Sequence, residues 1–123
     1  MNDKKSLGDW GEKQAADFLV AKGYTILERN YRTPYGEVDL VALSEGVTVF
    51  VEVKTRSSAR FGYPEESVNR RKMGHMTSAA AFYVQNHPDN SGDWRIDVVA
   101  ISRCSNPDQM EILHFENALT ENS

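Results

Sequence analysis

Two segments rich in β-branched residues, separated by only two positions, constrain the fold of this chain more than any other feature. The segments cover residues 36–44 (GEVDLVALS) and 47–55 (VTVFVEVKT), and Glu45 and Gly46 lie between them. Runs of this kind joined by a two-residue turn are typical of a β-hairpin. The sequence therefore predicts a hairpin in the middle of the chain.

The register of this hairpin decides which side chains meet. If Glu45 and Gly46 form the turn, residues whose numbers add up to 91 face one another. The pairs on one face are then Asp39 with Glu52, Glu37 with Lys54, Val41 with Phe50 and Leu43 with Thr48. The opposite face is apolar and suits packing under a helix, with Val38, Leu40, Ala42 and Ser44 against Val53, Val51, Val49 and Val47. Glu-Gly is a weaker turn signal than Asn-Gly, however, and a one-residue bulge would break the Asp39–Glu52 pairing.

The remaining segments predict two helices and three more strands. A capping pattern at Ser6 and Asp9 and a stop at Gly23 favour a first helix over about residues 7–22. The other predicted elements are a strand at residues 25–32, a helix at about residues 66–86 and strands at residues 95–102 and 110–115. The order α-β-β-β-α-β-β predicts an α/β protein with a mixed α+β sheet. We expect one domain over residues 1–123, with a core at about residues 7–116 and a frayed C-terminal tail.

Composition excludes several classes of protein. No run reaches the ~20 apolar residues that a membrane helix needs, and the first residues lack the apolar stretch of a signal peptide. Cys104 is the single cysteine, which excludes a disulfide framework and fits a cytoplasmic location. The net charge of −4 is unevenly distributed, because residues 54–86 carry a net charge of +4. A local nucleic-acid-binding surface therefore fits the sequence better than a globally basic one.

The acidic end of the hairpin face is where we expect chemistry. Two carboxylates directly opposite each other destabilise a hairpin unless a divalent cation lies between them, and Asp39 and Glu52 are such a pair. Lys54 follows on the same face and adds a positive charge without competing for the metal. Mg²⁺, or Mn²⁺ in its place, would polarise a phosphoryl oxygen and lower the pKa of a bound water. The pattern indicates a site for a phosphodiester.

Several motifs, in order along the chain, resemble a known family. They are LGDWGEKQAADFL, NYR, GEVDLVA, FVEVKTRSS, RFGYPEESV and RIDVVAI, and they span residues 7–101. Together they resemble the uncharacterised YraN-like family, which is related to archaeal Holliday junction resolvases. An acidic residue followed by E-x-K on the next strand also resembles the restriction-endonuclease-like nucleases, although Val38 stands where proline is usual. The resemblance implies a restriction-endonuclease-like core and a magnesium-dependent endonuclease.

The resemblance also implies roles for individual residues. Asp39 and Glu52 match the metal ligands, Lys54 matches the catalytic lysine, and Glu37 is an extra acid beside the site. Glu12 matches a first-helix glutamate that approaches the metal through water. On the predicted helix it shares a side with Ala16, Leu19 and Val20. An unpaired carboxylate in such an apolar neighbourhood is costly, which favours an inward role for Glu12.

Each of these residues also has a plainer interpretation. Glu52 and Lys54 could form an ion pair on an exposed edge, Glu12 could complement the helix dipole, and Glu37 could pair with Lys54. The basic residues proposed to contact nucleic-acid phosphates are Arg56, Arg60 and Lys72. The alternative for them is a solvated helix face balanced by acidic residues, and Lys72 shares its helical stripe with apolar residues. His75, His87, His114 and Asp97 receive no chemical role.

The leading hypothesis is therefore a nuclease that cuts DNA, at branched or otherwise structured sites, as a homodimer that places two active sites on two strands. A noncatalytic nucleic-acid-binding or adaptor domain with the same fold is the alternative. A third hypothesis, an RNA nuclease, differs from the leading one only in its substrate. The net negative charge predicts weak, salt-sensitive binding of nucleic acid, which a protein partner would strengthen.

Overall fold

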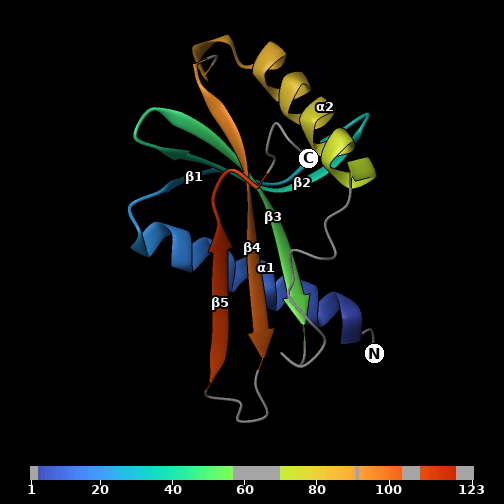
Figure 1. Cartoon of the computed structure of the whole chain (residues 1–123), viewed down its shortest axis with the longest axis vertical. Helices are drawn as coiled ribbons and strands as arrows, with labels where there is room; N and C mark the ends of the chain where they lie inside the picture. Colours follow the sequence, from blue (N-terminus) through green and yellow to red (C-terminus); the bar gives the residue numbers. More distant parts are fainter. Residues whose placement is uncertain (1–2, 57–69, 91, 104–108, 119–123) are drawn as a thin grey trace.

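The computed structural model describes residues 3–56, 70–90, 92–103 and 109–118, and it confirms the predicted mixed α+β fold (Figure 1). The elements are α1 (Asp3–Ala21), β1 (Thr25–Thr33), β2 (Gly36–Ser44), β3 (Val47–Arg56), α2 (Arg70–Asn86), the 3-10 turn η2 (Pro88–Asn90), β4 (Trp94–Arg103) and β5 (Met110–Phe115). Their order is the predicted α-β-β-β-α-β-β. Each strand lies within one residue of its predicted bounds, because strand periodicity is a local property of the sequence.

The five strands form one sheet in the order β1-β2-β3-β4-β5. Neighbouring strands are antiparallel except β3 and β4, which are parallel. A parallel pair requires the chain to return to the starting end of the sheet, and α2 lies in that connection (Figure 1). The helices pack on opposite faces of the sheet, so both faces are covered.

The first helix begins earlier than predicted but ends as expected. It starts at Asp3, so Ser6 lies inside the helix and is not its cap. The residues before Ser6 include two lysines and neither glycine nor proline, and nothing in them stops a helix from extending. At the other end, Gly23 has φ 97°, and the amide of Tyr24 donates to the carbonyl of Leu19 at 2.9 Å. This pattern terminates the helix. No helix in the described ranges is long and apolar enough to cross a membrane.

Two apolar layers hold the helices on the sheet. The layer under α1 contains Ala15, Ala16 and Leu19 against Leu40, Ala42, Val49 and Val51. The layer under α2 contains Met76, Ala79, Ala80 and Tyr83 against Val38, Val41, Phe50 and Ile96. Val20 is 54% exposed, so its predicted place on the buried side of the first helix is wrong. The buried face of α1 is therefore narrower than the sequence pattern indicates.

The regular alternation of β2 breaks at Asp39. Val38 and Val41 both pack on the α2 side, whereas Leu40 packs on the α1 side. The prediction that Val38 shares a face with Leu40 is therefore wrong. In β1, Asn30 lies between the residues paired with Leu40 and Val38, and its φ of 52° is left-handed. A left-handed residue redirects a strand locally, and Asn tolerates it better than most residues.

Candidate functional site

The hairpin has the predicted register only as far as the acidic residues. The ladder between β2 and β3 runs from the Ser44–Val47 pair to the Leu40–Val51 pair, which confirms Val41 opposite Phe50 and Leu43 opposite Thr48. Beyond that point the backbone pairs predicted for Asp39 and Glu37 are absent from the ladder. The Asp39 carboxylate instead accepts a hydrogen bond from the backbone amide of Val53 at 2.8 Å. A side chain replaces a backbone carbonyl here, while β3 continues its pairing with β4.

Asp39 and Glu52 nevertheless meet, through their side chains. Their carboxyl groups lie close enough for each to act on the other. Burial raises the pKa of Asp39 to about 8, the charge of Glu52 adds to this, and the hydrogen bond from the Val53 amide opposes it. At neutral pH the half-buried Asp39 therefore carries a proton beside the Glu52 side chain.

Glu12 reaches the same group of acids from α1. Burial raises its pKa, and the charges of Glu37 and Glu52 contribute. With its side-chain amide nitrogen turned toward the acids, Asn30 lies 2.9 Å from Glu12 Oε1 and 3.2 Å from Glu37 Oε1. The amide donates to both and so holds two like charges near each other. We call Glu12, Glu37, Asp39 and Glu52 the acidic cluster.

Sequence reasoning missed Asn30. Asn is depleted in strands and enriched at left-handed positions, so its place in the middle of a predicted strand was a usable signal. It also missed Gly11, where an added Cβ would collide with Oγ1 of Thr55 on β3. Only glycine lets α1 approach the strand so closely, one residue before Glu12. Gly11 positions the acidic cluster through the close approach of α1, and Asn30 does so through its left-handed backbone and its side-chain amide.

The structure describes only some of the basic side chains predicted to belong to the site. Lys54 and Arg56 are half-buried at the end of β3, where the strand continues beside β4. Arg32 on β1, the cross-strand neighbour of Glu37, forms an ion pair with it at 3.6 Å. Arg60 lies outside the described residues. Lys72 belongs to α2, but its side chain is likewise outside the described part of the chain.

The donor chemistry of the acidic cluster fits Mg²⁺, which takes carboxylate oxygens and keeps several waters. Asp39 and Glu52 are the two acidic residues that would hold it, in place of the proton that Asp39 carries. Within the described ranges, no three His, Cys, Asp or Glu side chains converge closely enough to hold an ion by themselves.

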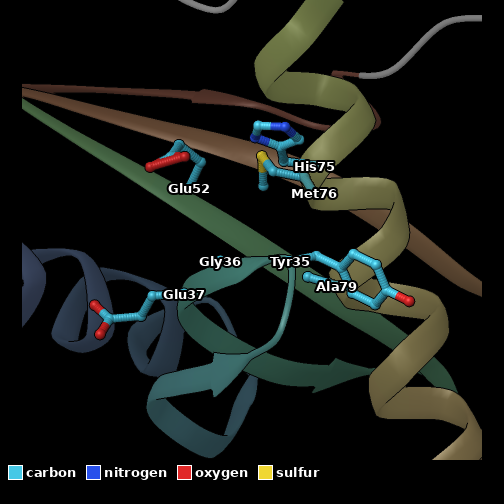
Figure 2. A pocket seen from close by; sticks show the side chains of 7 residues that line it. All are labelled: Tyr35, Gly36, Glu37, Glu52, His75, Met76 and Ala79. Carbon is cyan, nitrogen blue, oxygen red and sulfur yellow. The ribbon is translucent and has the colours of Figure 1, made fainter.

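A pocket of about 190 Å³ adjoins the acidic cluster on the α2 side (Figure 2). Its lining residues are Tyr35, Gly36, Glu37, Glu52, His75, Met76 and Ala79. Figure 2 shows the carboxylate of Glu37 directed toward α1, whereas the Tyr35 ring lies beside α2. The cluster is thus open to a ligand from one side of the sheet.

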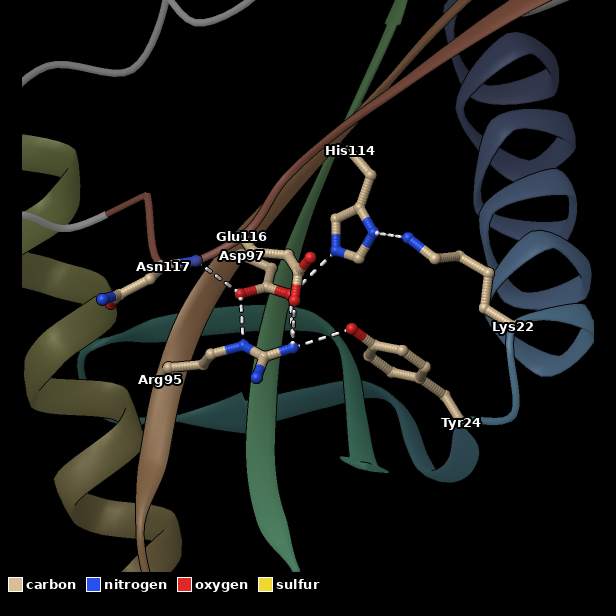
Figure 3. A network of polar contacts seen from close by, with 7 residues as sticks. All are labelled: Lys22, Tyr24, Arg95, Asp97, His114, Glu116 and Asn117. Carbon is tan, nitrogen blue, oxygen red and sulfur yellow. Dashed lines mark hydrogen bonds and ion pairs between the residues drawn. The ribbon is translucent and has the colours of Figure 1, made fainter. Parts of the chain in front are cut away.

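A second polar group lies around Asp97 on β4 (Figure 3). Its neighbours are hydrogen-bond donors, whereas the neighbours of Asp39 are acids. The carboxylate is fully buried and accepts hydrogen bonds from Arg95, His114 and the Asn117 amide at 2.8 to 3.0 Å. Burial alone would raise its pKa, but these bonds outweigh burial and lower it. Lys22 donates to the other ring nitrogen of His114 at 2.8 Å, so the Nε2–H faces Asp97.

Comparison with known proteins identifies the family. The model of the "Uncharacterised protein family UPF0102" matches residues 11–101. A UPF0102 protein of Syntrophomonas wolfei is 52% identical over 97 residues, covering 79% of this chain and 84% of the relative. One of Caldicellulosiruptor saccharolyticus is 40% identical over 116 residues, covering 94% and 98%. These matches confirm the predicted resemblance to the YraN-like family, and the chain belongs to the uncharacterised protein family UPF0102.

Proposed function

We propose that this chain is a metal-dependent nuclease that hydrolyses phosphodiester bonds in DNA. The observation that carries the proposal is the meeting of Asp39 and Glu52, two acidic side chains in a half-buried position, where burial and the charge of Glu52 raise the pKa of Asp39. Such a pair costs stability when no cation is bound. Strongly raised pKa values beside a pocket are typical of functional sites, and Lys54 follows Glu52 two residues later on the same strand.

Each residue of the cluster would have a separate task. Asp39 and Glu52 would hold Mg²⁺, or Mn²⁺, which when bound polarises the phosphoryl oxygen and acidifies a water molecule. Lys54 would stabilise the negative charge that develops on the phosphate. Glu12 would orient the attacking water from α1. Arg56, at the end of the same strand, would contact the DNA backbone.

Cleavage assays test the proposal directly. The substrates are single-stranded, duplex, flapped and four-way-junction DNA together with RNA, each with Mg²⁺, Mn²⁺ or a chelator. We expect metal-dependent products from the wild type and a loss of at least ~100-fold in Glu52→Gln and Lys54→Ala. Glu111→Ala, an exposed glutamate on β5, is the matched control and should cut normally. Equal activity in Glu52→Gln and the wild type would overturn the proposal.

A DNA- or RNA-binding adaptor is the second candidate, because no three metal-binding side chains converge within the described residues. An adaptor would bind nucleic acid equally well with Mg²⁺ or a chelator and would yield no products. The RNA substrate distinguishes an RNA nuclease in the same assay. The expected homodimer, and the expected help of a protein partner, are tested by measuring molar mass and salt-dependent affinity of the isolated chain.

A further inference from the structure

The pocket beside the acidic cluster has aromatic and apolar walls. One wall is the phenol ring of Tyr35, which is 52% exposed although it is a large aromatic side chain. Met76 and Ala79 on α2 form an apolar floor, and both are buried. Glu52 belongs to the pocket and to the acidic cluster, so a ligand in the pocket would lie directly beside the candidate metal position.

The turn that carries Tyr35 fixes the position of its backbone. The Tyr35 amide donates to Thr33 Oγ1 at 3.0 Å, and the Thr33 hydroxyl donates to the carbonyl of Gly36 at 2.7 Å. Gly36 has φ 130°, a conformation that is unstrained only for glycine. The ordered turn fixes the backbone from which the ring extends toward the pocket, so little backbone freedom is lost on binding.

The charge of the pocket indicates which part of a nucleic acid would enter it. Within the described residues its lining contains two glutamates and neither lysine nor arginine. A phosphate there would therefore meet no cationic side chain among the described lining residues, whereas a nucleobase is uncharged and flat. Aromatic rings and the soft thioether of methionine are good partners for such a surface. The ring nitrogens of His75 offer polar atoms for the edge of a base.

We propose that this pocket holds one unstacked nucleobase next to the bond that is cut, between the Tyr35 ring and the Met76 side chain. The inference rests on the proposed nuclease function and names its substrate class: DNA with unpaired nucleotides at the cleavage site. A base in an intact duplex must first leave its stack, which opposes binding. Single strands and flaps are therefore preferred over intact duplex, and over fully paired junction arms, by roughly 10- to 100-fold.

Fluorescence of 2-aminopurine tests the pocket without cleavage, since this base changes its emission when it leaves one stack and joins another. Single-stranded and duplex oligonucleotides that carry it are titrated in Ca²⁺, a hard cation that carboxylates also bind. Tyr35→Phe keeps the ring and should behave as the wild type. Tyr35→Ala should lose the emission change and bind the single strand about tenfold more weakly, with duplex affinity unchanged. Met110→Ala removes another exposed apolar residue, on β5, and is the matched control.

The outcomes separate this inference from the proposed function. If the wild type cuts DNA, but Tyr35→Ala gives the same emission change and the same ratio of single-stranded to duplex cleavage, the pocket inference is wrong and the nuclease stands. If the wild type cuts nothing with either metal, yet Tyr35→Ala alone loses the emission change, the base pocket stands and the nuclease proposal falls.

Discussion

Two aspartates, Asp39 on β2 and Asp97 on β4, lie in the same sheet with opposite electrostatic surroundings. Asp97 is surrounded by donors, and its pKa is lowered. Asp39 is buried beside other carboxyl groups, and its pKa is raised to about 8. Burial disfavours charge in both places, so the neighbours decide the outcome. The donor-rich site contributes to the stability of the fold, whereas the acid-rich site opposes it and is the better candidate for function.

Removing Asp97 should cost the fold more stability than any substitution in the acidic cluster. Asp97→Ala leaves Arg95 and the nearly buried ring of His114 without their shared acceptor. We expect a loss of about 3 to 5 kcal/mol in the free energy of unfolding, measured in urea at pH 7. Because the pKa of Asp97 is lowered in the folded state, its contribution is present above pH ~4 and disappears on acidification. A loss below ~1 kcal/mol at pH 7 would break the contrast with Asp39.

Asp39→Asn should stabilise the fold, whereas Asp97→Ala destabilises it. Asparagine can still accept the Val53 amide and can donate to Glu52, but it carries no charge. The raised pKa means that wild-type Asp39 is tolerated best below pH ~4 and opposes folding increasingly as the pH rises to about 8. We therefore expect a stability gain of roughly 1 to 3 kcal/mol at pH 9 that vanishes near pH 4, measured without metal. Destabilisation at pH 9 would contradict the assignment.

Metal affinity should share this pH dependence. A cation between Asp39 and Glu52 must displace the proton that Asp39 carries. Below pH 8, the affinity for Mn²⁺ is expected to fall roughly tenfold for each pH unit, as followed by calorimetric titration. Glu111→Ala should keep the wild-type profile, and Asp39→Asn should bind weakly at every pH. A flat profile between pH 6 and pH 8 would show that the metal binds elsewhere.

Substitutions of Asn30 should change stability and metal affinity the least. Two of them distinguish the contribution of the Asn30 backbone conformation from that of its side-chain amide. Asn30→Gly keeps the left-handed conformation but removes the amide between Glu12 and Glu37. We expect Mn²⁺ affinity to fall a few-fold with a stability change below ~1 kcal/mol. Asn30→Ala should lose about 1 kcal/mol more, since alanine is strained at positive φ. Equal stability of the two variants would show that the backbone of Asn30 is not strained.

Much of this structure is visible in local sequence patterns. The hairpin register holds from the turn to the Leu40–Val51 pair because alternation and a two-residue turn fix it. It fails at Asp39 because alternation within β2 cannot reveal a left-handed residue in the neighbouring strand. The Asp97 network was beyond sequence reasoning for a similar reason. Its members come from the turn between α1 and β1, from β4, from β5 and from the residues after β5, and each alone is an ordinary polar residue.

By itself, the sequence determined the order of helices and strands, the family, and the acidic pair followed by lysine at the open end of a hairpin. These features depend on spacing along one stretch of backbone. Only the tertiary structure decided that Glu12 and Asn30 reach that pair, that Tyr35 borders a pocket beside it, and that Asp97 is fully satisfied. Burial and the convergence of distant segments set those properties, because the free energy of a buried charge depends on its neighbours in space.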